Sequence, residues 1–163
     1  MEVYSGREQG PGCVNDILFS ESDAKYLGWK YKALDIDGKK ANETWNQFLS
    51  RSLGDAKFDG IFYAQHGNLS GPVNKAVSGM FAALTPSLSA YANSNVMIVA
   101  TQCRGMVDAA LLRTFKNSYK VDGVWTAAGF NATTINGFIS RIPYDPASDV
   151  HFYGKGYVPW KKK

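Results

Sequence analysis

The sequence predicts an α/β fold, a three-layer sandwich in which helices cover both faces of a mostly parallel β-sheet. Short apolar runs alternate along the chain with longer segments whose apolar residues recur at helical spacing. Strands that alternate with helices usually form a parallel sheet through helical crossovers. Composition agrees, because 163 residues with 45% hydrophobic and 13% aromatic side chains are enough for one domain with a full core.

The amino-terminal elements follow from breakers and apolar runs. Residues 1–12 mix Gly, Pro and polar groups without a period, so we expect an irregular arm, followed by one domain over residues 13–163. The apolar run at 14–19 predicts a first strand, and the polar residues after it offer N-caps for a helix over 20–31. Residues 33–36 predict a second strand.

A turn at Asp37 and Gly38 then precedes an amphipathic helix that ends near Gly54. Residues 58–64 are apolar on both alternating faces, as in a buried parallel strand. The next helix is expected to be kinked or divided at Pro86. The apolar residues that define the two helical faces are Ala41, Trp45, Phe48, Leu49 and Leu53 in the first, and Val77, Met80, Phe81, Leu84, Leu88 and Tyr91 in the second.

The most apolar strand is predicted at 96–100, and a helix is expected to begin at Met106, directly after the Cys103-Arg-Gly turn. Residues 121–128 predict a further strand, and 143–163 a loop and tail with short strands.

Charge and cysteine content exclude several classes. The net charge of +4 owes much to lysines near the carboxyl end, so no nucleic-acid partner is expected. No apolar run approaches the ~20 residues of a membrane span, and no signal peptide is visible, which predicts a cytoplasmic protein. Two cysteines make no disulfide framework, and neither a metal-ligand cluster nor a phosphate-binding glycine loop is present. We therefore expect no metal and no cofactor.

Two reactive residues follow the strand candidates at 58–64 and 96–100. His66 comes after the first and Cys103 after the second. Carboxyl ends of parallel strands form the ligand-binding edge of such sheets, and neighbouring strands lie ~5 Å apart. The pair is therefore predicted to form a catalytic dyad in which the imidazole supplies the base that a thiol nucleophile needs.

Backbone groups complete the predicted site. A helix that begins near Met106 would direct its N-terminal amides towards Cys103 and lower the thiol pKa. The N–H groups of Gly67 and Cys103 are the candidate oxyanion donors. The structural alternative is that Cys103 and His66 are ordinary core residues. For the second cysteine, Cys13, a structural role is the favoured interpretation, and for the second histidine, His151, a structural or surface role.

These motifs resemble those of caspase-like cysteine peptidases of the caspase–hemoglobinase fold. The resemblance rests on His66-Gly67 after one apolar strand and Cys103-Arg104-Gly105 after the next. It implies a Cys/His dyad and a pocket for the side chain preceding the cleaved bond, formed partly by the residue two before the cysteine. That residue is Thr101 here, whereas caspases have Gln and metacaspases Asp, so the substrate preference stays open.

Further specificity residues are weaker candidates. Asp35 and Asp37 follow the second predicted strand and could attract a basic side chain, although a solvated turn is the simpler interpretation. Arg141 could read an acidic side chain, as an arginine does in caspases. All three are retained as substrate-binding hypotheses.

The sequence thus predicts a cysteine endopeptidase that acts on a protein or peptide through a thioester, as an independent enzyme or as a toxin or effector domain of a larger polypeptide. Two alternatives stay open. The same thiolate could serve an acyltransferase or deamidase, or the domain could be a non-catalytic caspase-like module that binds proteins. An activating or inhibitory protein partner is compatible with each.

Overall fold

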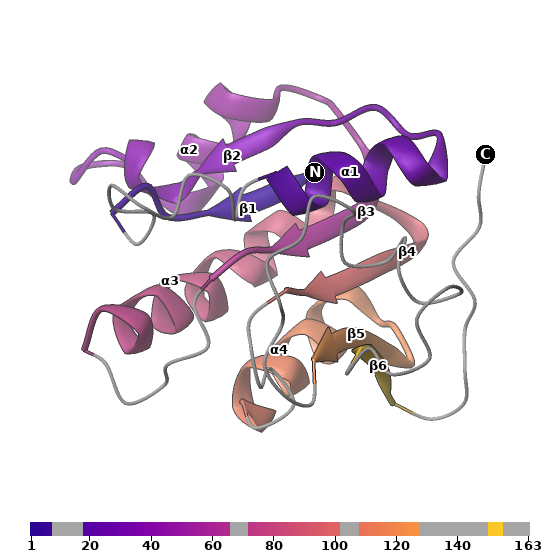
Figure 1. The fold of residues 1–163 in the computed structure, drawn as a ribbon. Helices are drawn as coiled ribbons and strands as arrows, with labels where there is room; N and C mark the ends of the chain where they lie inside the picture. The colour runs from indigo at the N-terminus through magenta and orange to yellow at the C-terminus, as the bar shows by residue number, and fades with distance from the viewer. Residues whose placement is uncertain (8–17, 66–71, 102–107, 128–149, 155–163) are drawn as a thin grey trace.

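The computed structural model describes residues 1–7, 18–65, 72–101, 108–127 and 150–154, and these residues have the predicted α/β architecture (Figure 1). The strands are β1 (Glu2–Tyr4), β2 (Ala33–Asp35), β3 (Phe58–Tyr63), β4 (Ala92–Ala100), β5 (Gly123–Ala127) and β6 (Val150–Gly154). The helices are α1 (Leu18–Leu27), α2 (Trp45–Leu53), α3 (Pro72–Leu88) and α4 (Ala109–Tyr119), with two short 3-10 helices, Ile36–Gly38 and Ser89–Tyr91.

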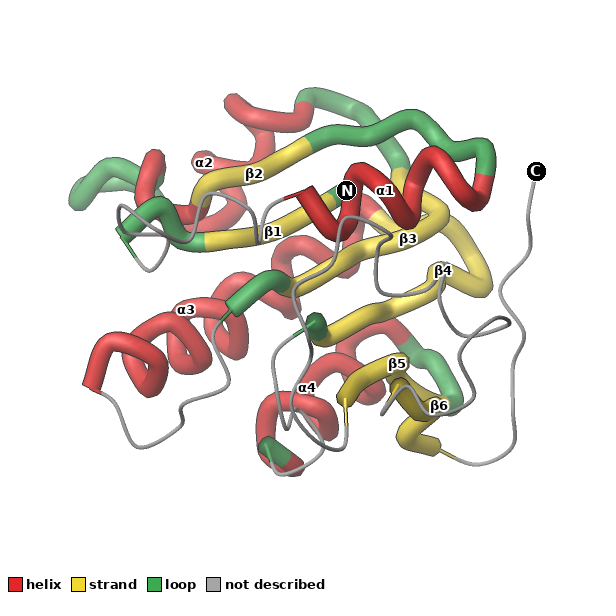
Figure 2. Tube along the Cα trace, viewed as in Figure 1, coloured by secondary structure: helices red, strands yellow, loops and turns green. Residues whose placement is uncertain are grey.

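All six strands belong to one sheet with the order β2-β1-β3-β4-β5-β6. Strands β1 to β5 pair in parallel, and β6 runs antiparallel to β5 at one edge. Figure 2 shows β5 and β6 side by side, with Ala127 opposite Val150 in the register. The sheet is therefore mostly parallel, as predicted.

Helices pack on both faces of this sheet. Side chains of α2, α3 and α4 form the larger core cluster, for example Leu49, Phe81 and Phe115 against Ile61 and Ile98. Leu27 of α1 belongs to the other cluster, on the opposite face. The direction of the connections along the sheet explains this arrangement. The chain runs from β1 outwards to β2, and then back past β1 to β3, β4 and β5. Because crossovers between parallel strands have the same hand, connections in opposite directions place their helices on opposite faces.

Strand β1 lies in the segment that we expected to be an irregular arm, and this expectation is wrong for residues 2–4. Strand β1 pairs with β2 on one side and β3 on the other. Val3 is fully buried in the core, and the buried Glu2 carboxylate accepts a hydrogen bond of 2.5 Å from the Tyr31 hydroxyl. Three residues are too few to present a strand period, so only the long-range pairing defines this strand.

The predicted first strand at 14–19 also needs correction. Residues 18 and 19 belong to helix α1, which ends at Leu27 rather than at Tyr31. The other residues of that predicted strand lie outside the described ranges. Gly28 follows the helix with a φ of 71°, a left-handed conformation that suits glycine and ends α1.

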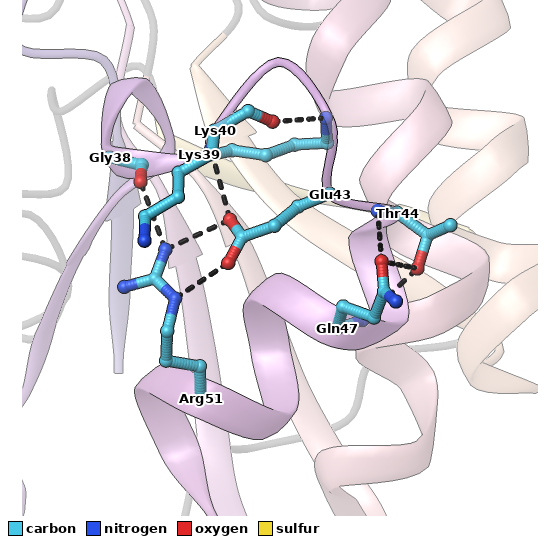
Figure 3. Close-up of polar contacts among 7 residues, drawn as sticks. All are labelled: Gly38, Lys39, Lys40, Glu43, Thr44, Gln47 and Arg51. Carbon is cyan, nitrogen blue, oxygen red and sulfur yellow. Dashed lines mark hydrogen bonds and ion pairs between the residues drawn. The ribbon is translucent and has the colours of Figure 1, made fainter.

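Helix α2 begins later than its apolar pattern suggested because its amino terminus is capped (Figure 3). The Thr44 side chain accepts from the Gln47 N–H, and the Gln47 side chain accepts from the Thr44 N–H. Next to this cap, Glu43 binds the Arg51 guanidinium at 2.7 Å and the Lys40 N–H at 2.9 Å. The hydrogen bond from Arg51, which has the larger effect, and the bond from the Lys40 N–H lower the pKa of Glu43 to about 2.

Strand β4 begins four residues before the predicted apolar run. Its start pairs with β3 through Phe58 and Ala92, but the register then shifts, and Gly60 pairs with Met97. Asn95 takes up this irregularity with a φ of 61°, a conformation that asparagine tolerates better than most residues. Polar residues at 93–95 are exposed, which hid the start of the strand from the sequence pattern.

Helix α3 continues through Pro86 and ends two residues later at Leu88. The Thr85 hydroxyl donates to the Phe81 carbonyl at 2.6 Å, one turn before the proline. Within the described residues, none of the helices is both long and apolar enough to cross a membrane.

Candidate active site

The candidate site is at the carboxyl edge of β3 and β4, which the structure makes hydrogen-bonded neighbours. The ladder between them reaches Thr101, whose N–H donates to the Tyr63 carbonyl at 3.0 Å. On the other side of β3, the Ala64 N–H donates to the Val3 carbonyl at 2.8 Å. The chain leaves β1 in one direction and β3 in the other, so the switch point at which such sheets often bind ligands is between β1 and β3, beside the β3–β4 pair.

The proposed dyad itself lies outside the described residues, as do Gly67, Arg141 and Cys13. What the structure supplies is the register of the strands that precede the two motifs. Tyr63 pairs with Ala100, a separation of 37 residues (100 − 63). His66 and Cys103 are separated by the same 37 residues in the sequence (103 − 66).

Thr101 lies at the edge but is tied to the backbone of β3. Its hydroxyl donates to the Tyr63 carbonyl at 3.2 Å, the same oxygen that accepts its N–H. Only 7% of the residue is exposed. The hydroxyl therefore extends the ladder between the two strands.

Asp35 and Asp37 join the ends of β2 and β1. One oxygen of Asp35 accepts from the N–H groups of Gly6 and Asp37, both at 3.0 Å. Asp37 accepts from the Ser5 hydroxyl at 2.8 Å, and its ion pair with Arg7 is 2.7 Å long. The Arg7 guanidinium of the chain itself thus occupies Asp37, and β1 lies between β2, which these aspartates end, and β3.

Hydrogen bonding keeps Asp37 ionised. Its partial burial alone would raise the pKa of the carboxyl, but the bonds from Arg7 and Ser5 outweigh burial and lower the pKa below its usual value. The hydrogen bond to Asp37 is the main reason why the pKa of the Arg7 guanidinium is raised. The pair therefore holds the chain that follows β1 against the end of β2.

A cluster of three polar residues, which the sequence did not reveal, links the carboxyl end of β3 to the amino terminus of α4 through α3. The Gln65 amide donates to the Ser78 hydroxyl at 2.8 Å, and Ser78 lies 3.2 Å from a carboxylate oxygen of Asp108. Gln65 is 7% exposed, and the other two residues are half-buried. Asp108 before an apolar helical run is an N-cap signal, but its contact with Ser78 depends on tertiary packing.

Asp108 also corrects the expected start of the helix after Cys103. The first residue of α4 is Ala109, and the Asp108 side chain accepts from the Leu111 N–H at 3.2 Å. The carboxylate therefore accepts a hydrogen bond from a backbone N–H at this helix terminus, and its negative charge offsets the partial positive charge of the helix. The argument that α4 itself lowers the thiol pKa of Cys103 is not supported.

A buried hydroxyl network lies behind the edge. Tyr63 OH is 2.8 Å from the Thr85 hydroxyl and 2.5 Å from Tyr119 OH, and the Tyr63 ring stacks on Phe115 with centroids 4.1 Å apart. Burial raises the pKa of Tyr63 and that of Tyr119 well above the usual tyrosine range. Both rings stay neutral and connect β3 to α3 and α4.

His151 lies on β6, in register with Thr126. Within the described ranges, His, Cys, Asp and Glu side chains form no group of three or more that could hold a metal ion. In comparisons with known proteins, no family model matches the chain, and no significant match is found among curated proteins or solved structures.

Proposed function

We propose that this protein is a caspase-like cysteine endopeptidase that cleaves peptide bonds with Cys103 as nucleophile and His66 as acid and base. One observation supports the proposal most strongly: β3 and β4, the strands that precede the two motifs, are parallel neighbours in a register of 37 residues, the spacing of His66 and Cys103. If both strands continued in this register, the two residues would be opposite one another, about 5 Å apart at their backbones.

The periodicity of the strands adds to this argument. Tyr63 and Ala100 are register partners on the same face of the sheet, in the larger core cluster. His66 is three residues after Tyr63, and Cys103 is three residues after Ala100. In an extended continuation of both strands, the two side chains would therefore lie together on the opposite face of the sheet. Imidazole and thiol would then be close enough for proton transfer.

The proposed reaction has two steps and needs neither a metal nor a cofactor. The Cys103 thiolate attacks the peptide carbonyl carbon, and the N–H groups of Gly67 and Cys103 bind the oxyanion. The C–N bond breaks as His66 donates a proton to the leaving amine, which leaves a thioester. His66 then takes a proton from water, whose oxygen attacks the thioester and releases the acid and the thiolate.

The proposal does not specify which substrate side chain is recognised before the cleaved bond. Asp37 already binds Arg7, and Thr101 is bonded to β3, so neither is carried into the proposed specificity pocket. Arg141 stays a hypothesis for binding an acidic side chain. Because the nucleophile is a free thiolate, we place its action in a reducing compartment such as the cytoplasm.

The decisive experiment is intact mass spectrometry after incubation with peptidyl acyloxymethyl ketones that carry Asp, Arg, Lys, Leu or Asn beside the reactive group. We expect one adduct per chain with at least one probe, no adduct in Cys103→Ala and at least tenfold slower labelling in His66→Ala. Cys13→Ala is the matched control and should label at the parent rate.

Two outcomes would overturn this proposal. Labelling that survives in Cys103→Ala would exclude the assigned nucleophile. Failure of every probe would favour a non-catalytic protein-binding module. If labelling succeeds, product analysis distinguishes peptide hydrolysis from acyl transfer or side-chain deamidation, since these share the thioester but not the product.

A further inference from the structure

The three polar residues Gln65, Ser78 and Asp108, here called the Ser78 bridge, connect three separate elements. Gln65 follows β3, Ser78 is on α3 and Asp108 caps α4. The Ser78 hydroxyl lies 2.8 Å from the Gln65 amide nitrogen, 3.2 Å from the Gln65 amide oxygen and 3.2 Å from Asp108 Oδ2. Each residue is therefore held by at least one neighbour from another element.

The hydrogen-bond direction in the bridge follows from the donors available. A serine hydroxyl has one proton to donate, and a carboxylate only accepts. The Gln65 amide nitrogen donates to Ser78 at the shortest distance. The Ser78 proton has two acceptors at 3.2 Å, the Gln65 amide oxygen and Asp108 Oδ2, and we assign it to the charged carboxylate because that is the stronger acceptor. The second oxygen of Asp108 caps Leu111. Both carboxylate oxygens are used, and the bond from Ser78 is charge-assisted.

The two ends of the bridge are close in sequence to the two motifs. Gln65 directly precedes His66, and Asp108 is five positions after Cys103 in the sequence (108 − 103). The last described ladder bond between β3 and β4 is the one from Thr101 to Tyr63. Beyond that bond, the Ser78 bridge links the chain that enters the histidine motif to the chain that leaves the cysteine motif.

We propose that Gln65, Ser78 and Asp108 are positioning residues for the Cys103–His66 pair, because their side chains fix the end of β3 relative to the start of α4. This inference rests on the proposed function. Loss of the bridge would let the imidazole and thiol separate, and even a small misplacement of reacting groups lowers the rate strongly. In this proposal the bridge acts through the two motifs and not through contact with the substrate.

The test is the pH dependence of alkylation of Cys103 by iodoacetamide, which needs no substrate pocket, with the modified residue identified by peptide mapping. The variants are Ser78→Ala and, at the other end of the bridge, Gln65→Met. Ser78→Thr keeps the hydroxyl and should retain the parent behaviour. Thr44→Ala is the matched control, because it removes a hydroxyl that accepts an N–H on α2, away from the motifs.

We expect the parent thiol to titrate below the usual ~8.5 and His66→Ala to abolish that shift. Ser78→Ala and Gln65→Met should move the thiol titration upwards by about one unit, which reduces the alkylation rate near pH 6.5 about tenfold. Ser78→Thr and Thr44→Ala should stay within about twofold of the parent. Measuring the melting temperature of every variant separates this effect from loss of stability.

The outcomes distinguish the two proposals. If His66→Ala changes the thiol titration while Ser78→Ala and Gln65→Met leave it at the parent value, the dyad stands and the positioning role is wrong. If the parent thiol titrates at its ordinary value and His66→Ala has no effect, the proposed function fails, and the inference fails with it. A shift in Thr44→Ala equal to that in Ser78→Ala would reduce the bridge to a general stabilising contact.

Discussion

At the scale of single residues, Gly60 is a position on β3 that has no room for a side chain. A Cβ at this residue would overlap the Trp29 ring and come within 3.1 Å of the Phe62 ring. Phe62 belongs to the smaller core cluster, on the face covered by α1, and the partly buried Trp29 packs against that cluster. Glycine is therefore required here by the close approach of an aromatic ring to the strand.

We predict that Gly60→Ala lowers the free energy of unfolding by about 1–3 kcal/mol, the usual cost of overpacking a core. Gly79→Ala is the matched control. Nothing lies within 4 Å of a Cβ at Gly79, which is an exposed position of α3, so alanine should stabilise the protein by about 0.5–1 kcal/mol. Urea unfolding of both variants tests this, and equal effects of the same sign would contradict the prediction.

Single residues also show where sequence reasoning reached its limit. Asp108 caps α4 and contacts Ser78, and only the cap has a local signal in the sequence. Asp35 and Asp37 were candidate ligands for a basic side chain, and the structure shows Asp37 bound to Arg7. Asp35 and Asp108 each have one partner within three positions. The other contacts of the three carboxylates, with Gly6, Arg7 and Ser78, span 29 or more positions and depend on the tertiary fold.

At the scale of elements, the pair Glu43–Arg51 makes the stability of α2 depend on pH. Hydrogen bonds from Arg51 and Lys40 lower the pKa of Glu43 from 4.5 to about 2. A depressed carboxyl pKa adds stability that is fully present above the unfolded pKa of 4.5 and is lost as the pH falls towards 2. The pair is at the protein surface, so the gain is small.

We predict that the difference in stability between the parent and Glu43→Gln is largest above pH 5 and disappears by about pH 2, because both proteins then carry a neutral side chain. Denaturant unfolding at several pH values measures the difference. NMR titration should show that Arg51→Met raises the pKa of Glu43 towards 4.5. A parent carboxyl that titrates near 4.5 would contradict the ion-pair assignment.

The elements that the sequence predicted well are those whose own pattern is strong. Strand β3 was predicted over 58–64 and is observed over Phe58–Tyr63, because its residues are apolar on both faces. Strand β1 was missed because three residues carry no period, and α4 begins later than predicted because its cap decides its start. Local patterns reveal long elements, whereas short strands and helix ends depend on partners distant in sequence.

At the scale of the whole molecule, the sheet order predicts which backbone amides are most protected. Strands β3 and β4 each have a neighbour on both sides, whereas β2 and β6 are edge strands. Ile61, Ile98 and Val99 are fully buried or nearly so. Opening these strands requires disruption of the core on both faces of the sheet.

We predict that the amides of residues 61–63 and 97–100 exchange with deuterium only through global unfolding, and that those of β2 and β6 exchange faster. Native-state hydrogen exchange at increasing denaturant tests this, since the free energies of opening at the centre should converge on the global value. Faster exchange in β3 than in β2 would contradict the observed strand order.

The strand alternation predicted the sheet and its helices, and it predicted that β3 and β4 are neighbours. It could not predict that β1 separates β2 from β3, since a strand of three residues leaves no signature in the pattern. For the candidate site, the residue types and the spacing of 37 came from the sequence, and the matching register came from the fold.

The antiparallel direction of β6 has a consequence for how this fold can diversify. Because Ala127 is opposite Val150, the connection over residues 128–149 leaves the sheet and returns to it at the carboxyl edge, where β3 and β4 also end. A change in this connection that leaves both of its ends in place therefore keeps the five described register pairs between β5 and β6. Under the proposed function, the entry and the exit of this connection both adjoin the edge of the sheet at which we place Cys103 and His66.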